Sequence, residues 1–289
     1  MPTALVIDAG GTKFRVCLKD SEDPVTILEI VGGSNWSRDR LRELNNATQN
    51  LKSRPSKVIA FIAGLLTQLD EEEAVQLMRQ QWPEARIEVW SDYVGPLHQS
   101  EIGAIALIAG TGCVVASKSD DGYAKTGGWG PLIGDLGSGF DLGRKGLWNY
   151  ACRNWQNDLF LKSAKEIFKT EDQTKIMAAA GQLEGVSSIA RLAEVMLELA
   201  ASGEPVAIAA VQQSAADQAR LIEGHCDRLN LPKTGDLILY GSLVVRSETM
   251  REFLEQELKR LGTSFSFTML TEEQMLSGVA SYAFERDRL

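Results

Sequence analysis

The residues best suited to phosphate chemistry lie in two glycine turns, each of which follows an apolar segment. The first turn is Asp8-Ala9-Gly10-Gly11-Thr12-Lys13, and the second is Ala109-Gly110-Thr111-Gly112. Backbone N–H groups in such turns can surround a phosphate, and an acid at the strand end can hold Mg²⁺. A plain tight hairpin is the alternative for each turn. Because the same device occurs twice, the pair favours phosphate binding more strongly than either turn alone.

Two further segments carry groups that could act on a hydroxyl-bearing ligand. Asp92 follows the apolar segment 86–91 and could accept a proton from an attacking hydroxyl, a role typically worth ~10²–10⁴-fold in rate. Its alternative role is to cap a following helix. The loop Gly127–Gly139 packs six glycines into 13 residues around Trp129 and Asp135. Glycine permits close approach of backbone to a ligand, and the carboxylate could accept hydroxyl hydrogen bonds.

A third kind of site is indicated further along the chain. The apolar strand 237–240 runs into Gly241-Ser242, whose small side chains could pack against an adenine ring. A simple strand-to-helix turn is an equal alternative. Gly203 lies just before Pro205, which suits the first position of a helix.

The elements that must position these groups follow from apolar periodicity. Strands are predicted at 4–8, 14–19, 25–31, 57–63, 86–91, 104–109, 113–118, 123–126, 237–240 and 264–269. Helices are predicted at 38–51, 71–81, 139–151, 187–201, 205–229, 247–260 and 271–284. The same order of elements occurs twice: three strands come first, and helices and further strands follow. This repeat indicates a duplicated α/β architecture. We expect one domain over residues 1–98 and a second over 99–289, whose last helix could pack back on the first.

Composition limits the classes of function. The 289 residues carry 30 basic and 39 acidic side chains, a net charge of −9, which disfavours nucleic-acid and anionic-membrane partners. The four cysteines form no CxxC pair, so a structural zinc or iron–sulfur site is not expected. No signal peptide or membrane-spanning stretch is visible, so a cytoplasmic location is predicted. The oligomeric state stays open, with a homodimer as one option.

Together, these motifs in this order resemble the N-acetylglucosamine kinase and BadF/BadG branch of the actin/hexokinase/Hsp70 superfamily. The most specific stretch runs from Gly110-Thr111-Gly112 through Gly127-Gly128-Trp129-Gly130 to Gly134-Asp135. The resemblance covers nearly the whole chain. It implies an α/β fold of two ribonuclease-H-like, actin-like ATPase domains with an active-site cleft between them. It also implies ATP-dependent transfer of a phosphoryl group to a hydroxyl of an amino sugar, chiefly the 6-hydroxyl of N-acetylglucosamine.

The resemblance also assigns roles to individual residues. Asp92 matches the catalytic base, and Asp8 matches the acid on the Mg²⁺ side. The ATP-binding set is Gly10, Gly11, Thr12, Lys13, Gly110, Thr111, Gly112, Gly203, Gly241 and Ser242. The sugar-binding set is Asn35, Trp36, Asp92, Gly112, Cys113, Gly128, Trp129, Gly130 and Asp135.

Departures from the family pattern leave the preferred sugar open. Cys113 and Val114 replace a serine and a polar residue, and Leu136 replaces an acid beside Asp135. Glucosamine, N-acetylmuramate and glucose are therefore alternative substrates. A sugar or nucleotide sensor without catalysis and an ATPase activator of the BadF type are alternative functions.

Overall fold

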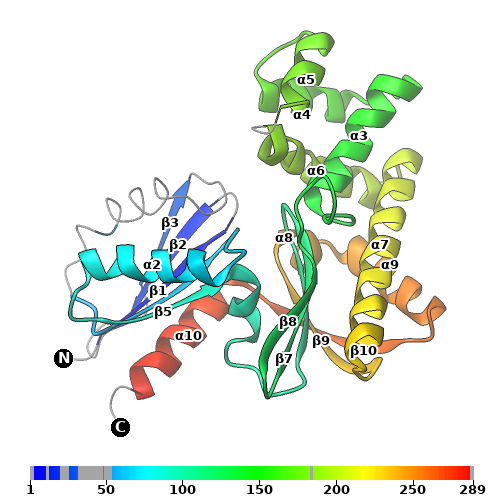
Figure 1. Cartoon of the computed structure of the whole chain (residues 1–289). Helices are drawn as coiled ribbons and strands as arrows, with labels where there is room; N and C mark the ends of the chain where they lie inside the picture. The colour runs from blue at the N-terminus through cyan, green and yellow to red at the C-terminus, as the bar shows by residue number, and fades with distance from the viewer. Residues whose placement is uncertain are drawn as a thin grey trace. The chain divides into compact units, whose positions relative to one another are not determined.

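The computed structural model of the chain describes residues 3–10, 13–19, 26–31, 48, 54–182 and 185–286. It divides into two compact units (Figure 1). Unit 1 comprises Met1–Glu101 and Thr271–Leu289, and unit 2 comprises Ile102–Leu270. The segment 99–289, expected as one domain, is thus divided at Thr271, and its last part belongs with the N-terminal unit.

Unit 1 is built on a five-stranded mixed sheet with the order β3-β2-β1-β4-β5. Its strands are β1 (Ala4–Ala9), β2 (Lys13–Lys19), β3 (Thr26–Val31), β4 (Lys57–Ile62) and β5 (Arg86–Ser91). The first three form an antiparallel meander, whereas β1, β4 and β5 run parallel. Every residue of β1 and β4 is buried, as expected for central parallel strands covered on both faces.

Helices cover this sheet and complete the core of unit 1. Helix α2 (Gln68–Gln81) packs on β5, and α10 (Glu272–Arg286) packs on β1 and β2. Helix α2 begins three residues earlier than predicted, because Thr67 and Asp70 form a capping box. The predicted helix at 38–51 lies outside the described residues except for Thr48, which is helical.

Unit 2 repeats the topology of unit 1. Its sheet has the order β10-β9-β6-β7-β8. Its strands are β6 (Ile105–Ala109), β7 (Cys113–Ser119), β8 (Gly122–Gly127), β9 (Thr234–Tyr240) and β10 (Ser264–Leu270). Here too an antiparallel meander of three strands is followed by two strands parallel to the first. The predicted duplication is therefore confirmed strand by strand.

Helices make up most of unit 2 outside the sheet. They are α3 (Gly139–Arg153), α4 (Asp158–Phe168), α5 (Gln173–Ala180), α6 (Gly185–Ala201), α7 (Pro205–Leu229), α8 (Ser242–Val245) and α9 (Glu248–Arg260). In Figure 1, α7 and α9 run alongside the sheet, whereas α4 and α5 stand beyond its end. Sequence analysis did not predict α4 and α5. They are short, and they fully bury Phe160, Ala164 and Ile176. Further apolar residues of both helices pack partly buried against the core of unit 2.

Candidate functional site

Asp8 lies in the carboxyl-terminal part of β1 and is almost completely buried, with 6% of its surface exposed. In the antiparallel register it faces Arg15 of β2, and Arg15 Nη1 lies 3.4 Å from Asp8 Oδ2. Arg15 also reaches Glu272, the first residue of α10, at 3.7 Å. Burial raises the pKa of Asp8 to about 6, and the positive charge of Arg15 limits that rise.

Asp92 lies at the same edge of the sheet as Asp8. Asp8 is level with Phe61 of β4, which is level with Trp90 of β5, and Asp92 comes two residues after Trp90. The charge of Asp92 contributes to the raised pKa of Asp8. Asp92 is not a helix cap: it opens the 3₁₀ helix η1 (Asp92–Leu97), and Ser91 occupies the cap position. The fold thus brings together two acids that are 84 residues apart in the sequence.

The turn Gly110-Thr111-Gly112 in unit 2 has a distinctive backbone arrangement. Its three carbonyl groups accept hydrogen bonds from the N–H groups of Gly139 (2.7 Å), Phe140 (3.2 Å) and Gly110 (3.0 Å), respectively. The first two donors lie in the first turn of α3. Because C=O and N–H of a trans peptide point in opposite directions, the N–H groups of Thr111 and Gly112 are directed away from α3. Successive N–H groups that point the same way form a concavity suited to an anion.

The glycine loop after β8 brings Asp135 against this turn. Asp135 Oδ1 accepts a hydrogen bond of 3.4 Å from the Cys113 N–H, and a Cβ added to Gly112 would lie 3.1 Å from Asp135 Oδ2. Gly130 has a positive φ of 86° and starts a turn in which its carbonyl accepts a hydrogen bond from the Gly134 N–H. The indole of Trp129 in this loop is 60% exposed. The loop therefore presents an aromatic face and a carboxylate together.

Cys113 and Gly128 contribute to the site through their backbones. The Cys113 thiol is buried in the core of unit 2, and burial raises its pKa above its usual range. The Cys113 carbonyl accepts from the Gly128 N–H at 2.9 Å. Val114 packs beside Gly128, since a Cβ added there would lie 3.1 Å from Val114 Cβ. The predicted thiol contact with a sugar is thus not supported by the position of this side chain.

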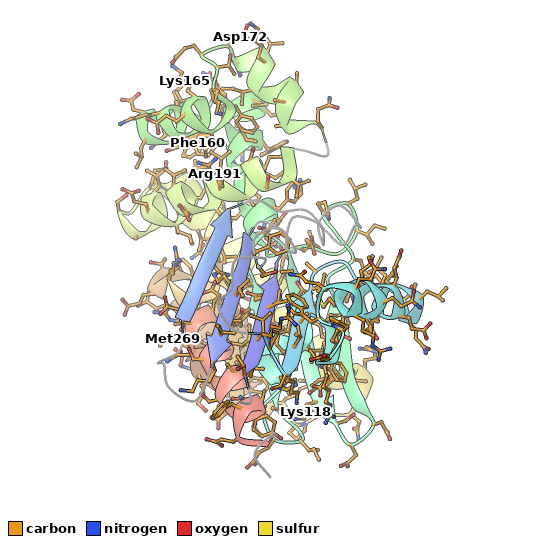
Figure 2. The ribbon with its side chains drawn as sticks, turned by 90° about the vertical axis from the view of Figure 1, so that its left-hand side faces the viewer. Lys118, Phe160, Lys165, Asp172, Arg191 and Met269 are labelled. Atoms are coloured by element: carbon orange, nitrogen blue, oxygen red, sulfur yellow. The ribbon has the colours of Figure 1, made fainter. Side chains whose placement is uncertain are left out.

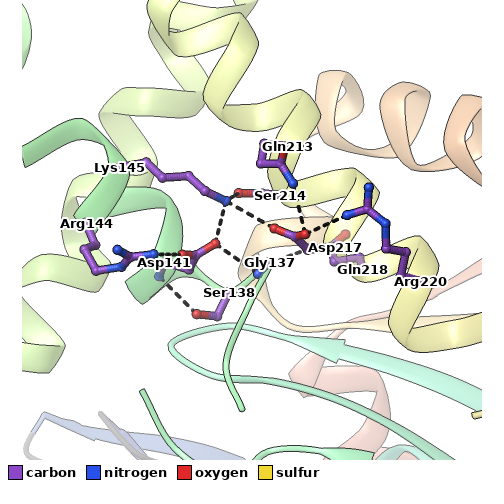
Figure 3. A network of polar contacts seen from close by, with 10 residues as sticks. All are labelled: Gly137, Ser138, Asp141, Arg144, Lys145, Gln213, Ser214, Asp217, Gln218 and Arg220. Carbon is purple, nitrogen blue, oxygen red and sulfur yellow. Dashed lines mark hydrogen bonds and ion pairs between the residues drawn. The ribbon is translucent and has the colours of Figure 1, made fainter. Parts of the chain in front are cut away.

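A network of charged side chains fixes the end of the glycine loop (Figure 3). Asp141 Oδ2 accepts from the Gly137 N–H (3.1 Å) and from Lys145 Nζ (2.5 Å). Lys145 continues to Ser214 Oγ at 3.0 Å on α7. The Gly137 carbonyl accepts from Gln218 Nε2 at 2.7 Å, so both polar groups of this glycine are held by side chains. The bonds to Lys145 and Arg144 outweigh burial and lower the pKa of Asp141.

Sequence analysis missed this network, although part of it has a local signature. Ser138 caps α3 by accepting from the Asp141 N–H, and Asp141 precedes Lys145 by four residues, which places both on one helical face. That spacing predicts an ion pair but not its connection to Gly137. The contribution of α7, through Ser214 and Gln218, is a tertiary contact with no local sequence signal.

The predicted adenosine-side residues lie in two turns of unit 2. Gly241 has a φ of 97°, and a Cβ there would lie 2.5 Å from the Ala109 carbonyl oxygen, so glycine is required where β9 passes the end of β6. Ser242 follows it as the first residue of α8. Gly203 lies in the α6–α7 turn, where an added Cβ would meet nothing within 4 Å. Its φ of 91° accounts for the glycine without a ligand.

Some predicted site residues lie outside the described residues. Gly11, Thr12, Asn35 and Trp36 belong to this group. Gly10 is described and follows β1, and Lys13 begins β2. Within the described ranges, no group of three or more His, Cys, Asp and Glu side chains is arranged to hold a metal ion. No described helix has the length and apolarity needed to cross a membrane.

Comparison with known proteins assigns the family. Residues 5–263 match the BadF/BadG/BcrA/BcrD ATPase family. The chain belongs to this ATPase family. An N-acetylmuramic acid/N-acetylglucosamine kinase of Clostridium acetobutylicum is 26% identical over 163 residues, which are 51% of this chain and 53% of that protein. The match therefore spans about half the length of this curated relative.

Solved structures confirm the fold class of this BadF-family chain. A candidate N-acetylglucosamine kinase from Porphyromonas gingivalis superposes with a TM-score of 0.77 at 21% identity, over 99% of this chain and 100% of that one. A hexokinase of the ROK type from Thermus thermophilus superposes with a TM-score of 0.56 at 16% identity, over 99% of each chain. The predicted α/β, actin-like ATPase fold is thus confirmed.

Proposed function

We propose that this chain is an ATP-dependent sugar kinase that transfers the γ-phosphoryl group of ATP to a hydroxyl of an amino sugar, with the 6-hydroxyl of N-acetylglucosamine as the preferred acceptor. The observation that carries the proposal is the pair Asp8 and Asp92 at one edge of the unit 1 sheet, close enough for their charges to interact. The ATPase family and the named activity of the Clostridium relative support it.

In this proposal Asp92 is the general base. It would accept the proton of the acceptor hydroxyl as that oxygen attacks phosphorus, and proton acceptance of this kind is typically worth ~10²–10⁴-fold in rate. Its place at the start of η1, directly after a strand of the sheet, gives the carboxylate a rigid support. Phosphoryl transfer otherwise depends on positioning and charge, which the remaining residues would supply.

Asp8 fits a role in holding Mg²⁺. Mg²⁺ prefers carboxylate oxygens and usually retains several waters while it bridges to phosphates. A buried acid whose pKa is raised to about 6 by burial and by a neighbouring acid is a place where a cation would relieve electrostatic cost. When bound, Mg²⁺ would neutralise phosphate charge during transfer. The carboxylate of Asp8 would hold it, and Arg15 keeps that carboxylate in place.

The glycine segments would bind the nucleotide and the acceptor. The Thr111 and Gly112 N–H groups would meet phosphate oxygens, together with Gly10, Gly11, Thr12, Lys13 and Gly110 of the two turns. Gly203, Gly241 and Ser242 would lie at the adenosine. Trp129 would stack on the apolar face of the sugar ring, and Asp135 would accept its hydroxyls. Asn35, Trp36, Gly128 and Gly130 complete the proposed acceptor set.

Release of ADP from Mg-ATP across a panel of sugars tests the proposal. The panel contains N-acetylglucosamine, glucosamine, N-acetylmuramate, glucose and a control without sugar. Release that depends on N-acetylglucosamine is expected. Release that is equal without sugar would instead indicate an ATPase activator, and absence of release with every sugar would contradict the kinase assignment.

A further inference from the structure

Lys125 of β8 lies over the Trp129 ring, and its charge acts on Asp135, although no motif in the sequence singled it out. Its Nζ is 4.6 Å from the centroid of the Trp129 ring, a cation–π contact. Burial raises the pKa of the Asp135 carboxyl, and the positive charge of Lys125 limits that rise. One ammonium group therefore interacts with the aromatic face and the acid that the loop presents together.

The backbone that carries Lys125 is anchored from helix α7. Arg228 Nη2 donates to the Lys125 carbonyl at 2.7 Å and to Thr126 Oγ1 at 2.8 Å. His225, which is completely buried, shares a hydrogen bond of 2.8 Å with the same hydroxyl. These contacts fix the end of β8, so the backbone that carries the Lys125 side chain has a defined position.

The surroundings of Asp135 explain why a cation there matters. Burial raises the pKa of Asp135. Backbone hydrogen bonds from Cys113 and Gly130 oppose that rise, and so does the positive charge of Lys125. The buried Cys113 thiol of β7 lies nearby and stays neutral, since burial and the neighbouring acids raise its pKa. When ionised, the Asp135 carboxylate can accept sugar hydroxyls on both oxygens, whereas protonation turns one of these oxygens into a donor.

We propose that Lys125 is a positioning residue of the acceptor site, whose ammonium group holds the Trp129 indole in the arrangement that binds the sugar and places a positive charge near the Asp135 carboxylate. The acceptor part of this inference rests on the proposed kinase function. Lys125 acts through Trp129 and Asp135 and takes no part in phosphoryl transfer.

The steady-state kinetics of Lys125→Met with N-acetylglucosamine test the inference, with Lys118→Met as the matched control. Lys118 lies on the same hairpin, is similarly half-buried and covers the Tyr123 ring at 5.9 Å. Figure 2 shows Lys118 at the end of unit 2 opposite Lys165 of α4 and Asp172, which caps α5. Loss of the cation–π contact should raise the acceptor KM roughly fivefold, while the ATP KM stays unchanged.

The pH profile separates a positioning role from a merely structural one. In Lys125→Met the acidic limb of kcat/KM for the sugar should move to higher pH, because Asp135 loses a neighbouring positive charge. Lys125→Arg should restore the limb, and Lys118→Met should not move it. An unchanged acceptor KM with an unmoved limb would overturn the inference, as would an equal rise in the ATP KM.

A measurement that needs no turnover keeps the inference separate from the kinase proposal. Carboxyl NMR titration of protein labelled at aspartate, with Asp135→Asn for assignment, should show a higher pKa of Asp135 in Lys125→Met than in the wild type. If the wild type phosphorylates no sugar, the kinase proposal fails and this shift still decides whether Lys125 acts on Asp135. An identical titration in both proteins would overturn it.

Discussion

Arg15 lies opposite Asp8 across the β1–β2 pair, with Nη1 3.4 Å from Oδ2, and both side chains are largely removed from solvent. The distance is long for a hydrogen bond of full strength, yet the pair matters because Asp8 is buried. A buried carboxylate without a counter-charge must either take up a proton or pay a desolvation penalty of several kcal/mol. The guanidinium of Arg15 is therefore part of what lets unit 1 fold with an acid inside its sheet.

The Asp8–Arg15 pair predicts a non-additive pattern of stability. Arg15→Met should reduce the free energy of unfolding of unit 1 by up to about 3 kcal/mol at pH 7, because it removes the positive charge that faces the buried Asp8 carboxylate. The same substitution in an Asp8→Asn background should cost much less, since no charge is left uncompensated. Hydrogen exchange of the β1 and β2 amides measures both. Arg86→Met, which removes an exposed partner of Glu88, is the control and should change little. Equal costs in the two backgrounds would refute the pairing.

We expect Asp92→Asn to lose turnover while the protein stays folded. Removal of the proposed base should cut kcat by roughly 10²–10⁴ while the affinity for nucleotide stays nearly constant, because asparagine keeps the size and removes the proton acceptor. Coupled measurement of ADP release and equilibrium binding of ATP tests both parts. Asp121→Asn in the exposed β7–β8 turn serves as the control for the chemical change. Wild-type turnover in Asp92→Asn would remove Asp92 from the mechanism.

The strands and most helices could be predicted because their signals are local. The apolar segments gave strand β5 with its bounds and β1, β4, β6 and β9 within a few residues. Helix α4 was missed although its signal is also local: Phe160, Leu161, Ala164, Ile167 and Phe168 recur at helical spacing and pack against the core of unit 2. The proximity of Asp8 and Asp92 follows from parallel pairing of strands whose carboxyl ends share one sheet edge. The family resemblance, and not their spacing, indicated their roles.

The supporting contacts of the glycine loop could not be predicted in the same way. Ser214 and Gln218 of α7 act through tertiary contacts with Lys145 of α3 and with Gly137, which depend on how the helices pack, whereas Lys125 contacts Trp129 four residues later. Nothing in the local sequence around Gln218 says that its amide donates to the Gly137 carbonyl. The residues that present a ligand-binding loop were visible in the sequence, whereas those that hold it in place became visible only in the fold.

We expect Asp141→Asn to lower both the stability of unit 2 and the order of the glycine loop. The substitution leaves Lys145 and the Gly137 N–H with a weaker, neutral acceptor, and breaking a buried ion pair typically costs about 3 kcal/mol or more. Because the pKa of Asp141 is lowered, its contribution is present above the ordinary value of 3.8 and is lost as pH falls below it. Urea unfolding and exchange of the Gly137 amide measure the two effects. Unchanged protection of that amide would contradict the anchoring role. Lys259→Met, which breaks an exposed pair with Glu255 on α9, should stay near the wild type.

The burial of His225 leads us to expect that unit 2 loses stability in mild acid. Its ring is completely buried between two neutral hydroxyls, Thr126 Oγ1 at 2.8 Å from Nδ1 and Ser117 Oγ at 3.0 Å from Nε2. Burial, reinforced by the charge of Arg228, lowers the pKa of His225 from 6.5 to about 4. In the unfolded chain His225 therefore takes up a proton near pH 6.5, whereas in the folded unit it takes up that proton only near pH 4. Stability should be complete above pH 6.5 and fall by about 3 kcal/mol between pH 6.5 and pH 4.

The test of this acid sensitivity compares slopes rather than absolute stabilities. His225→Gln removes the titrating ring, so exchange protection of the β7 and β8 amides, corrected for intrinsic rates, should depend less on pH in this range than in the wild type. The only other histidine in the sequence is His98, which lies in unit 1 against Phe61 and Tyr282. His98→Gln should therefore leave the slope of unit 2 unchanged. A wild-type slope retained in His225→Gln would show that other groups, such as the carboxylates of the Asp141 network, account for the acid response.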